Sequence, residues 1–177
     1  MRTSALDLRL IYEVQLRVMS ATTPTAKINA VRTPLLELHR LLLLSLKKDH
    51  ETLAGRVLNP AEWFQTLLSS PEYQWVKPLN SLMADVDALS ELSKIGDRDM
   101  AILRHHLETL FFKDDEDVTS FNSHYRKAFS QHHELVLSHG QLKEAVGVLP
   151  AEKLPLNSDE IRVGWHKIGA SKRKLLN

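Results

Sequence analysis

Apolar residues recur three or four positions apart along most of the chain, which is the spacing that gives an α-helix one buried face. The first stripe predicts an amphipathic helix over residues 4–20, with the apolar positions Leu6, Leu10, Ile11, Val14 and Val18. Residues 20–25 follow as a predicted connector. The next helix is predicted to begin at Pro34, with Thr33 as its N-cap, and to run to about Leu53 before Gly55. Leucines cover more than half of its circumference, so this helix should lie at the centre of a bundle or beneath a partner.

Proline and acidic residues mark the starts of the later helices. The predicted starts are Asn59-Pro60, Ser70-Pro71, Pro78 and Asp97. A last long helix is predicted over residues 118–146. No segment alternates apolar and polar residues between hairpin turns, so strands are not expected. The pattern predicts an all-α bundle of about six to seven helices over residues 1–149, followed by a basic, partly ordered tail over residues 150–177.

Composition and charge narrow the function classes. The 177 residues carry a net charge of +1, which excludes a globally basic protein, so nucleic acid is not an expected partner. Cysteine is absent from the sequence, which excludes a disulfide scaffold, an iron–sulfur cluster and a thiol nucleophile. No apolar run approaches the ~20 residues that cross a bilayer, and acidic residues interrupt the first 20 positions. We therefore expect a cytoplasmic protein that does not enter a membrane.

Three segments resemble a family of small uncharacterised all-helical proteins of bacteria. They are the Pro-rich, aromatic segment over residues 56–89, the leucine-rich helix around His39, and the segment over residues 124–146. The resemblance extends over about half of the chain. It implies an all-α bacterial fold, and it brings no activity with it.

Nine histidines are the most distinctive candidates for chemistry, because imidazole is the commonest protein ligand for metals. In a single helix His132 and His139 would share one face, and the segment over residues 105–112 is similar to the His-rich helix of hemerythrins. The candidate ligands of a metal or haem are His39, His105, His132, His139 and Glu108. However, the chain contains no Glu-x-x-His pair, the signature of carboxylate-bridged di-iron bundles. Hydrogen-bonded bundle histidines are therefore the preferred interpretation, and a site for iron, zinc or haem is the alternative.

Four aromatic residues between two prolines form a candidate partner surface or ligand pocket: Trp63, Phe64, Tyr73 and Trp75. The competing interpretation is that they anchor a short helix and a turn onto the core. The sequence contains no nucleophile elbow and no Gly-rich phosphate loop. These observations favour a non-enzymatic interaction or regulatory protein that forms homodimers and needs no cofactor. The alternative function is a metal or haem sensor or carrier.

Overall fold

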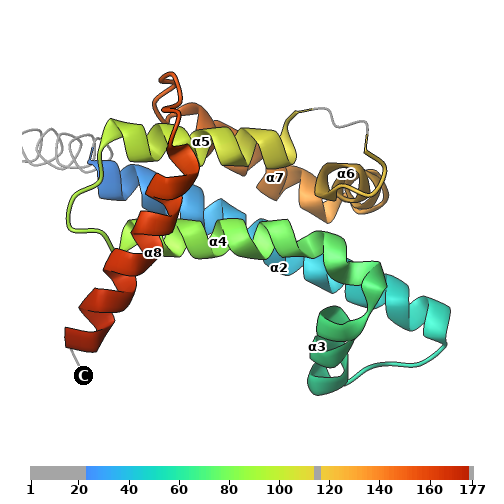
Figure 1. Cartoon of the computed structure of the whole chain (residues 1–177). Helices are drawn as coiled ribbons and strands as arrows, with labels where there is room; N and C mark the ends of the chain where they lie inside the picture. Colours follow the sequence, from blue (N-terminus) through green and yellow to red (C-terminus); the bar gives the residue numbers. More distant parts are fainter. Residues whose placement is uncertain (1–22, 114–116, 176–177) are drawn as a thin grey trace, which may run out of the picture.

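The computed structural model describes residues 23–113 and 117–175, and side chains as far as residue 168. The predicted helix over residues 4–20 lies outside these ranges. The described chain is all-α, which confirms the predicted fold class, and it contains seven α-helices and one 3₁₀ helix (Figure 1). In chain order these are α2 (Pro24–Ala54), α3 (Pro60–Ser69), η1 (Pro71–Val76), α4 (Lys77–Ser90), α5 (Asp97–Phe111), α6 (Phe121–Gln131), α7 (Glu134–Gly147) and α8 (Ser158–Leu175).

The long helix α2 is the centre of the bundle, and α4 and α7 pack along it (Figure 1). Its fully buried apolar side chains alternate three and four residues apart, and they are Ile28, Val31, Leu35, Leu38 and Leu42. This spacing produces a narrow seam that faces the neighbouring helices. Other leucines of the same helix, including Leu36 and Leu44, remain exposed. Of the two positions expected for the leucine-rich helix, the structure shows the one at the centre of the bundle.

The predicted start of this helix at Pro34 is wrong. The helix begins ten residues earlier at Pro24, where the Thr23 hydroxyl accepts a hydrogen bond of 3.2 Å from the Ala26 N–H. Both positions carry the same Thr-Pro signal, so the local sequence does not distinguish them. Pro34 lies within α2, and its ring is buried. Burial of the ring favours proline at this position, although proline has no N–H to donate to the helical hydrogen bonds. The predicted end is confirmed, because Gly55 adopts a left-handed conformation with φ 65°.

Local capping signals set the next helix boundaries as expected. At the start of α3 the Asn59 side chain accepts from the Glu62 N–H, and the Glu62 carboxylate accepts from the Asn59 N–H, each at 2.9 Å. Pro78 lies in the first turn of α4.

The N-cap predicted at Asp97 differs from the observed N-cap by one residue. Gly96 is the N-cap of α5, and its N–H donates to the Asp99 carboxylate.

The single helix predicted over residues 118–146 is wrong, because the chain turns at His132 between α6 and α7. His132 has an extended backbone, and its Nε2–H donates to the Asp49 carboxylate of α2 at 2.9 Å. On the other side of the break, Ser45 of α2 donates to Glu134, the first residue of α7. Contacts with α2 therefore fix the position of the break, and α7 runs back along that helix.

The segment predicted as a tail contains α8, which packs against α4 and α5 (Figure 1). Trp165 is only 2% exposed, and its indole N–H donates to the Asp99 carboxylate at 2.9 Å. Arg162 and His166 both reach the buried Asp85 carboxylate of α4, at 3.0 Å and 2.7 Å. The described part of this segment thus belongs to the bundle, which differs from the boundary expected after residue 149.

Candidate interaction surface

The five candidate metal ligands are spread over the bundle: His39 lies on α2, His105 and Glu108 on α5, His132 in the break after α6, and His139 on α7. Four of them have polar partners inside the chain. His39 of α2 shares a hydrogen bond of 3.1 Å with Asn80 of α4, and His132 is held by α2. Glu108 accepts from Arg104 one turn earlier on α5, at 2.7 Å. Among the residues that the structure describes, no group of three or more histidines and carboxylates is placed to hold a metal ion.

His139 is the candidate most deeply involved in packing. Its Nδ1 shares a hydrogen bond of 2.9 Å with the Tyr125 hydroxyl of α6, and its ring lies over the Tyr125 ring. The Phe112 and Phe129 rings complete the aromatic surroundings, with centroids 5.2 Å and 4.9 Å away. Burial lowers the pKa of His139 and raises the pKa of Tyr125, because the charged form of each would lose its hydration. Both groups are therefore neutral hydrogen-bond partners at neutral pH.

We expect the stability of the protein to fall as the pH is lowered through the titration range of histidine. Burial lowers the pKa values of His39, His105, His106 and His139 below the ordinary value of 6.5. Below that value the histidines take up protons more readily in the unfolded chain than in the folded chain. The stability that these histidines contribute is therefore fully present above the unfolded pKa and is lost as the pH falls towards their lower folded pKa values. The urea midpoint should decrease from about pH 7.5 to about pH 5.5. His139→Gln should flatten this dependence, whereas replacing the fully exposed His133 with glutamine should leave it unchanged.

The four aromatic candidates for a partner surface face different directions. Trp63 and Tyr73 are buried in a small cluster beneath α2, where the Tyr73 hydroxyl bonds His50 Nδ1 at 2.9 Å. Trp75 stacks on the ring of His124 of α6. Only Phe64 is largely exposed. Three of the four residues therefore anchor α3 and η1 to the bundle, as the competing interpretation holds.

A different set of apolar side chains is exposed at the same end of the molecule. We call it the α3 patch, and it consists of Leu53 (85% exposed), Val57 (80%), Phe64 (62%) and Leu68 (59%). All four lie within sixteen consecutive residues, from the last turn of α2 to the last turn of α3 (Figure 1). Leu53, Val57 and Leu68 were not among the candidates expected from the sequence, although Phe64 and Leu68 are one helical turn apart on a face of α3 that turns away from Trp63. Spacing could have identified that pair.

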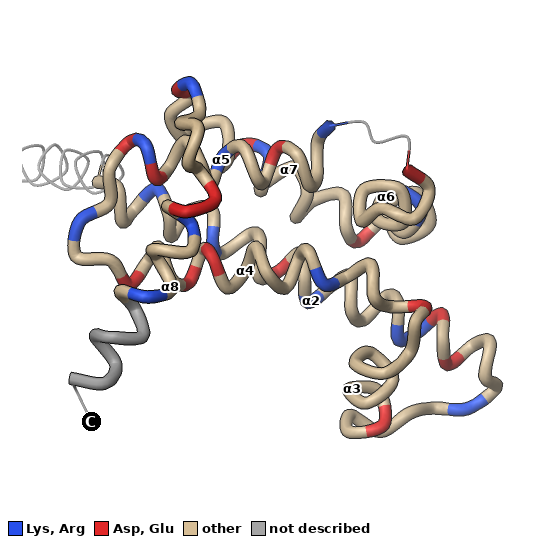
Figure 2. The backbone as a smooth tube through the Cα atoms, viewed as in Figure 1, with Lys and Arg blue, Asp and Glu red and all other residues tan. Residues whose placement is uncertain are grey.

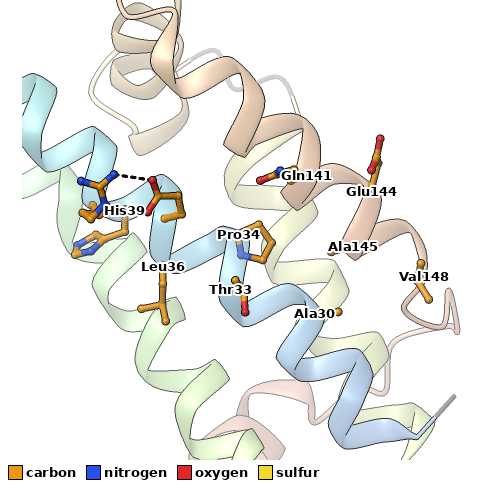
Figure 3. Close-up of a pocket in the computed structure, with 11 residues that line it drawn as sticks. Ala30, Thr33, Pro34, Leu36, His39, Gln141, Glu144, Ala145 and Val148 are labelled. Atoms are coloured by element: carbon orange, nitrogen blue, oxygen red, sulfur yellow. Dashed lines mark hydrogen bonds and ion pairs between the residues drawn. The ribbon is translucent and has the colours of Figure 1, made fainter. Parts of the chain in front are cut away.

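A second apolar surface is a groove of about 1000 Å³ beside the first half of α2, which we call the α2–α7 groove. Figure 3 shows Ala30 and Pro34 of α2 facing Ala145 of α7 and Val148, which directly follows α7, with Leu36 on the opposite side of α2. Charged side chains lie on the rim, where the Arg40 guanidinium pairs with the Glu37 carboxylate at 2.6 Å.

No family model, no curated protein and no solved structure matches the chain. Within the described residues, none of the helices is long and apolar enough to cross a membrane.

Proposed function

We propose that this protein is a non-enzymatic interaction protein that forms a homodimer through the α3 patch. The observation that carries the proposal is the exposure of four large apolar side chains in one sixteen-residue stretch. Large apolar side chains that are exposed close together often mark an interface, because their burial is favourable by roughly 25 cal/mol per Å². Around this patch the other large apolar side chains, such as Trp63 and Tyr73, are buried.

The charge distribution around the α3 patch supports a second copy of the same chain as the partner. In a two-fold dimer each patch meets its own copy, so an uncompensated charge near the axis would face an identical charge. Between residues 57 and 71 the chain has one charged residue, Glu62 (Figure 2). Arg56 donates to its carboxylate at 3.1 Å, and the Asn59 N–H donates to its other oxygen. The surface is therefore apolar and free of like-charge repulsion when it pairs with itself.

The test is the molar mass in solution, measured by light scattering on a sizing column at micromolar concentration. The wild-type chain is expected at twice its mass of 20.2 kDa. Phe64→Asp and Leu68→Asp should each give a protein of single-chain mass, because each would bury a carboxylate at the interface. Val163→Asp is the matched control, since Val163 is an exposed apolar residue of α8 and its replacement should leave the dimer intact.

Two results would contradict the proposal. One is a wild-type protein that stays at single-chain mass throughout the micromolar range. The other is a dimer that survives both substitutions on α3, which would place the interface elsewhere. The circular dichroism spectrum of each variant shows that the helical fold is retained, so that loss of the dimer is not confused with unfolding.

A cytoplasmic location completes the proposal, and the absence of cysteine supports it.

A further inference from the structure

We propose that a cavity between α4 and α5 binds a small hydroxylated organic anion, such as a sugar phosphate or a sugar acid. The cavity has a volume of about 480 Å³, and small-molecule sites occupy roughly 300–1,000 Å³. It runs between α4 and α5, with α8 at one end and the start of α6 at the other (Figure 1). It is separate from the α3 patch, so the proposal stands independently of the proposed dimer.

The lining of the cavity favours a negatively charged ligand. Its polar side chains are Ser81 of α4, His106 and Thr109 of α5, Ser120 and Asn122 at the start of α6, and Arg162 of α8. Among the residues that the structure describes, no carboxylate lines this cavity. A guanidinium is therefore accompanied by hydroxyl, amide and imidazole groups, which hydrogen-bond a bound anion without repelling it.

The guanidinium of Arg162 is fixed at the α8 end of the cavity. The buried Asp85 carboxylate, which does not line the cavity, holds the Arg162 Nε at 3.0 Å and also binds His166 at 2.7 Å. The Arg162 Nη1 lies 3.5 Å from Nε2 of His106. Burial and the charge of Arg162 lower the pKa of His106, so its imidazole is neutral at neutral pH. A guanidinium held from behind in this way is a preorganised donor for a carboxylate or phosphate oxygen.

The start of α6 provides hydrogen-bonding groups for hydroxyls at the other end. Asn122 is only 3% exposed, and its Nδ2–H donates to the Leu110 carbonyl at 3.3 Å. Its Oδ1 is buried and has no hydrogen-bond partner among the described residues, which is an unfavourable arrangement that a ligand hydroxyl would relieve. Making this contact requires the amide to turn, because the oxygen is shielded from solvent. The Ser120 hydroxyl accepts from the Ser123 N–H, so its own proton is still available to a ligand.

The distance between the two ends sets the size of the ligand. His106 lies beside Arg162 and Leu110 lies beside Asn122, and these two residues of α5 are one helical turn apart, about 6 Å along the axis. In a sugar phosphate or a sugar acid, the anionic group and the distant hydroxyls are separated by a distance of this order. A neutral sugar or an inorganic anion would use only one end of the cavity.

Isothermal titration calorimetry with glucose-6-phosphate and with gluconate tests the proposal. Each probe carries an anionic group and hydroxyls, whereas inorganic phosphate and glucose each carry one of the two. We expect at least one probe to bind one per chain, about tenfold or more tightly than glucose or inorganic phosphate. The tighter probe identifies phosphate or carboxylate as the preferred anionic group. If neither probe binds more tightly than the single-group compounds, the proposal is overturned.

Two variants locate the bound probe. Thr109→Val removes a hydroxyl of the cavity without touching the pair of Arg162 and Asp85, and it should weaken binding about three- to tenfold. Thr52→Val is the matched control, because Thr52 is exposed on α2 outside the cavity, and it should leave the affinity unchanged.

Arg162→Gln removes the charged donor and should weaken binding by about tenfold or more. Thr109→Val keeps the test decisive if the loss of the Asp85 pair also loosens α8, which the circular dichroism spectrum and the urea midpoint of Arg162→Gln would reveal. An affinity that is the same for the wild type, Thr109→Val and Arg162→Gln would place the probe outside this cavity and overturn the proposal.

Discussion

Replacing Trp165 with alanine is expected to lower the free energy of unfolding by about 3–5 kcal/mol, the usual cost of removing a large buried aromatic side chain. The indole is almost fully buried where α8 packs against α4 and α5, and its N–H donates a hydrogen bond to the Asp99 carboxylate. Asp99 also caps the first turn of α5 through the Gly96 N–H. The substitution therefore leaves a cavity and removes a hydrogen bond at the base of α5. Urea unfolding followed by circular dichroism measures the loss.

The control for this experiment lies two residues away on the same helix. Val163 is half exposed, so Val163→Ala should change the free energy of unfolding by no more than about 0.5 kcal/mol. If Trp165→Ala were equally mild, α8 would contribute nothing to the folded bundle, as a tail would. A large loss with Trp165→Ala alone would show that the cooperative unit extends past residue 149.

Helix ends were predictable where the deciding groups are neighbours in the sequence. The reciprocal hydrogen bonds of Asn59 and Glu62, and the left-handed Gly55, lie within a few residues of the ends they define. Each satisfies backbone groups that have no helical partner, so the sequence alone is sufficient to place them. The same reasoning located Pro78 in the first turn of α4.

Boundaries that depend on distant contacts were not predictable in this way. The break at His132 is held by Asp49, which is 83 residues away in the chain, and nothing within the local sequence forces it. The docking of α8 depends on a carboxylate of α4 that lies 81 residues from His166. Two prolines before α8 suggested a tail, but the buried Trp165 and the Asp85 carboxylate bind the helix to the bundle. In each case a tertiary contact outweighs the local signal.

The residues near α3 also divide into those that the sequence could place and those that depend on tertiary packing. The aromatic residues near α3 were identified from composition, which does not reveal the direction of a side chain. The rings of Trp63 and Tyr73 are buried against His50 of α2, whereas Phe64 is exposed. Helical spacing within α3 would have paired Phe64 with Leu68. The exposure of Leu53 depends on how α2 ends, so it could not be inferred before the packing of α3 was known.

The second large effect is expected for His139→Ala, which should lower the free energy of unfolding by about 1–3 kcal/mol. The substitution leaves the hydroxyl of the buried Tyr125 without its hydrogen-bond partner and removes a ring that packs between Phe112 and Phe129. His133→Ala is the matched control, because the His133 side chain is fully exposed and its removal should change stability by less than about 0.5 kcal/mol. Adding Tyr125→Phe to His139→Ala should recover part of the loss, since it removes the unpaired hydroxyl.

The same variants distinguish a packing histidine from a metal ligand. We expect the purified wild-type protein to be colourless, without stoichiometric iron or haem, and to contain zinc only when zinc is added in excess. A tight site requires three or four ligands within about 2 to 2.3 Å of one ion, whereas His39, His132 and His139 are held by Asn80, Asp49 and Tyr125. Metal analysis and an absorption spectrum should therefore be the same for wild type, His39→Ala and His139→Ala. One bound ion or haem per chain that disappears in His139→Ala but persists in His133→Ala would instead establish the cofactor alternative. In that outcome the loss of stability would follow the loss of the ligand, and adding the ligand would stabilise the wild type but not the variant.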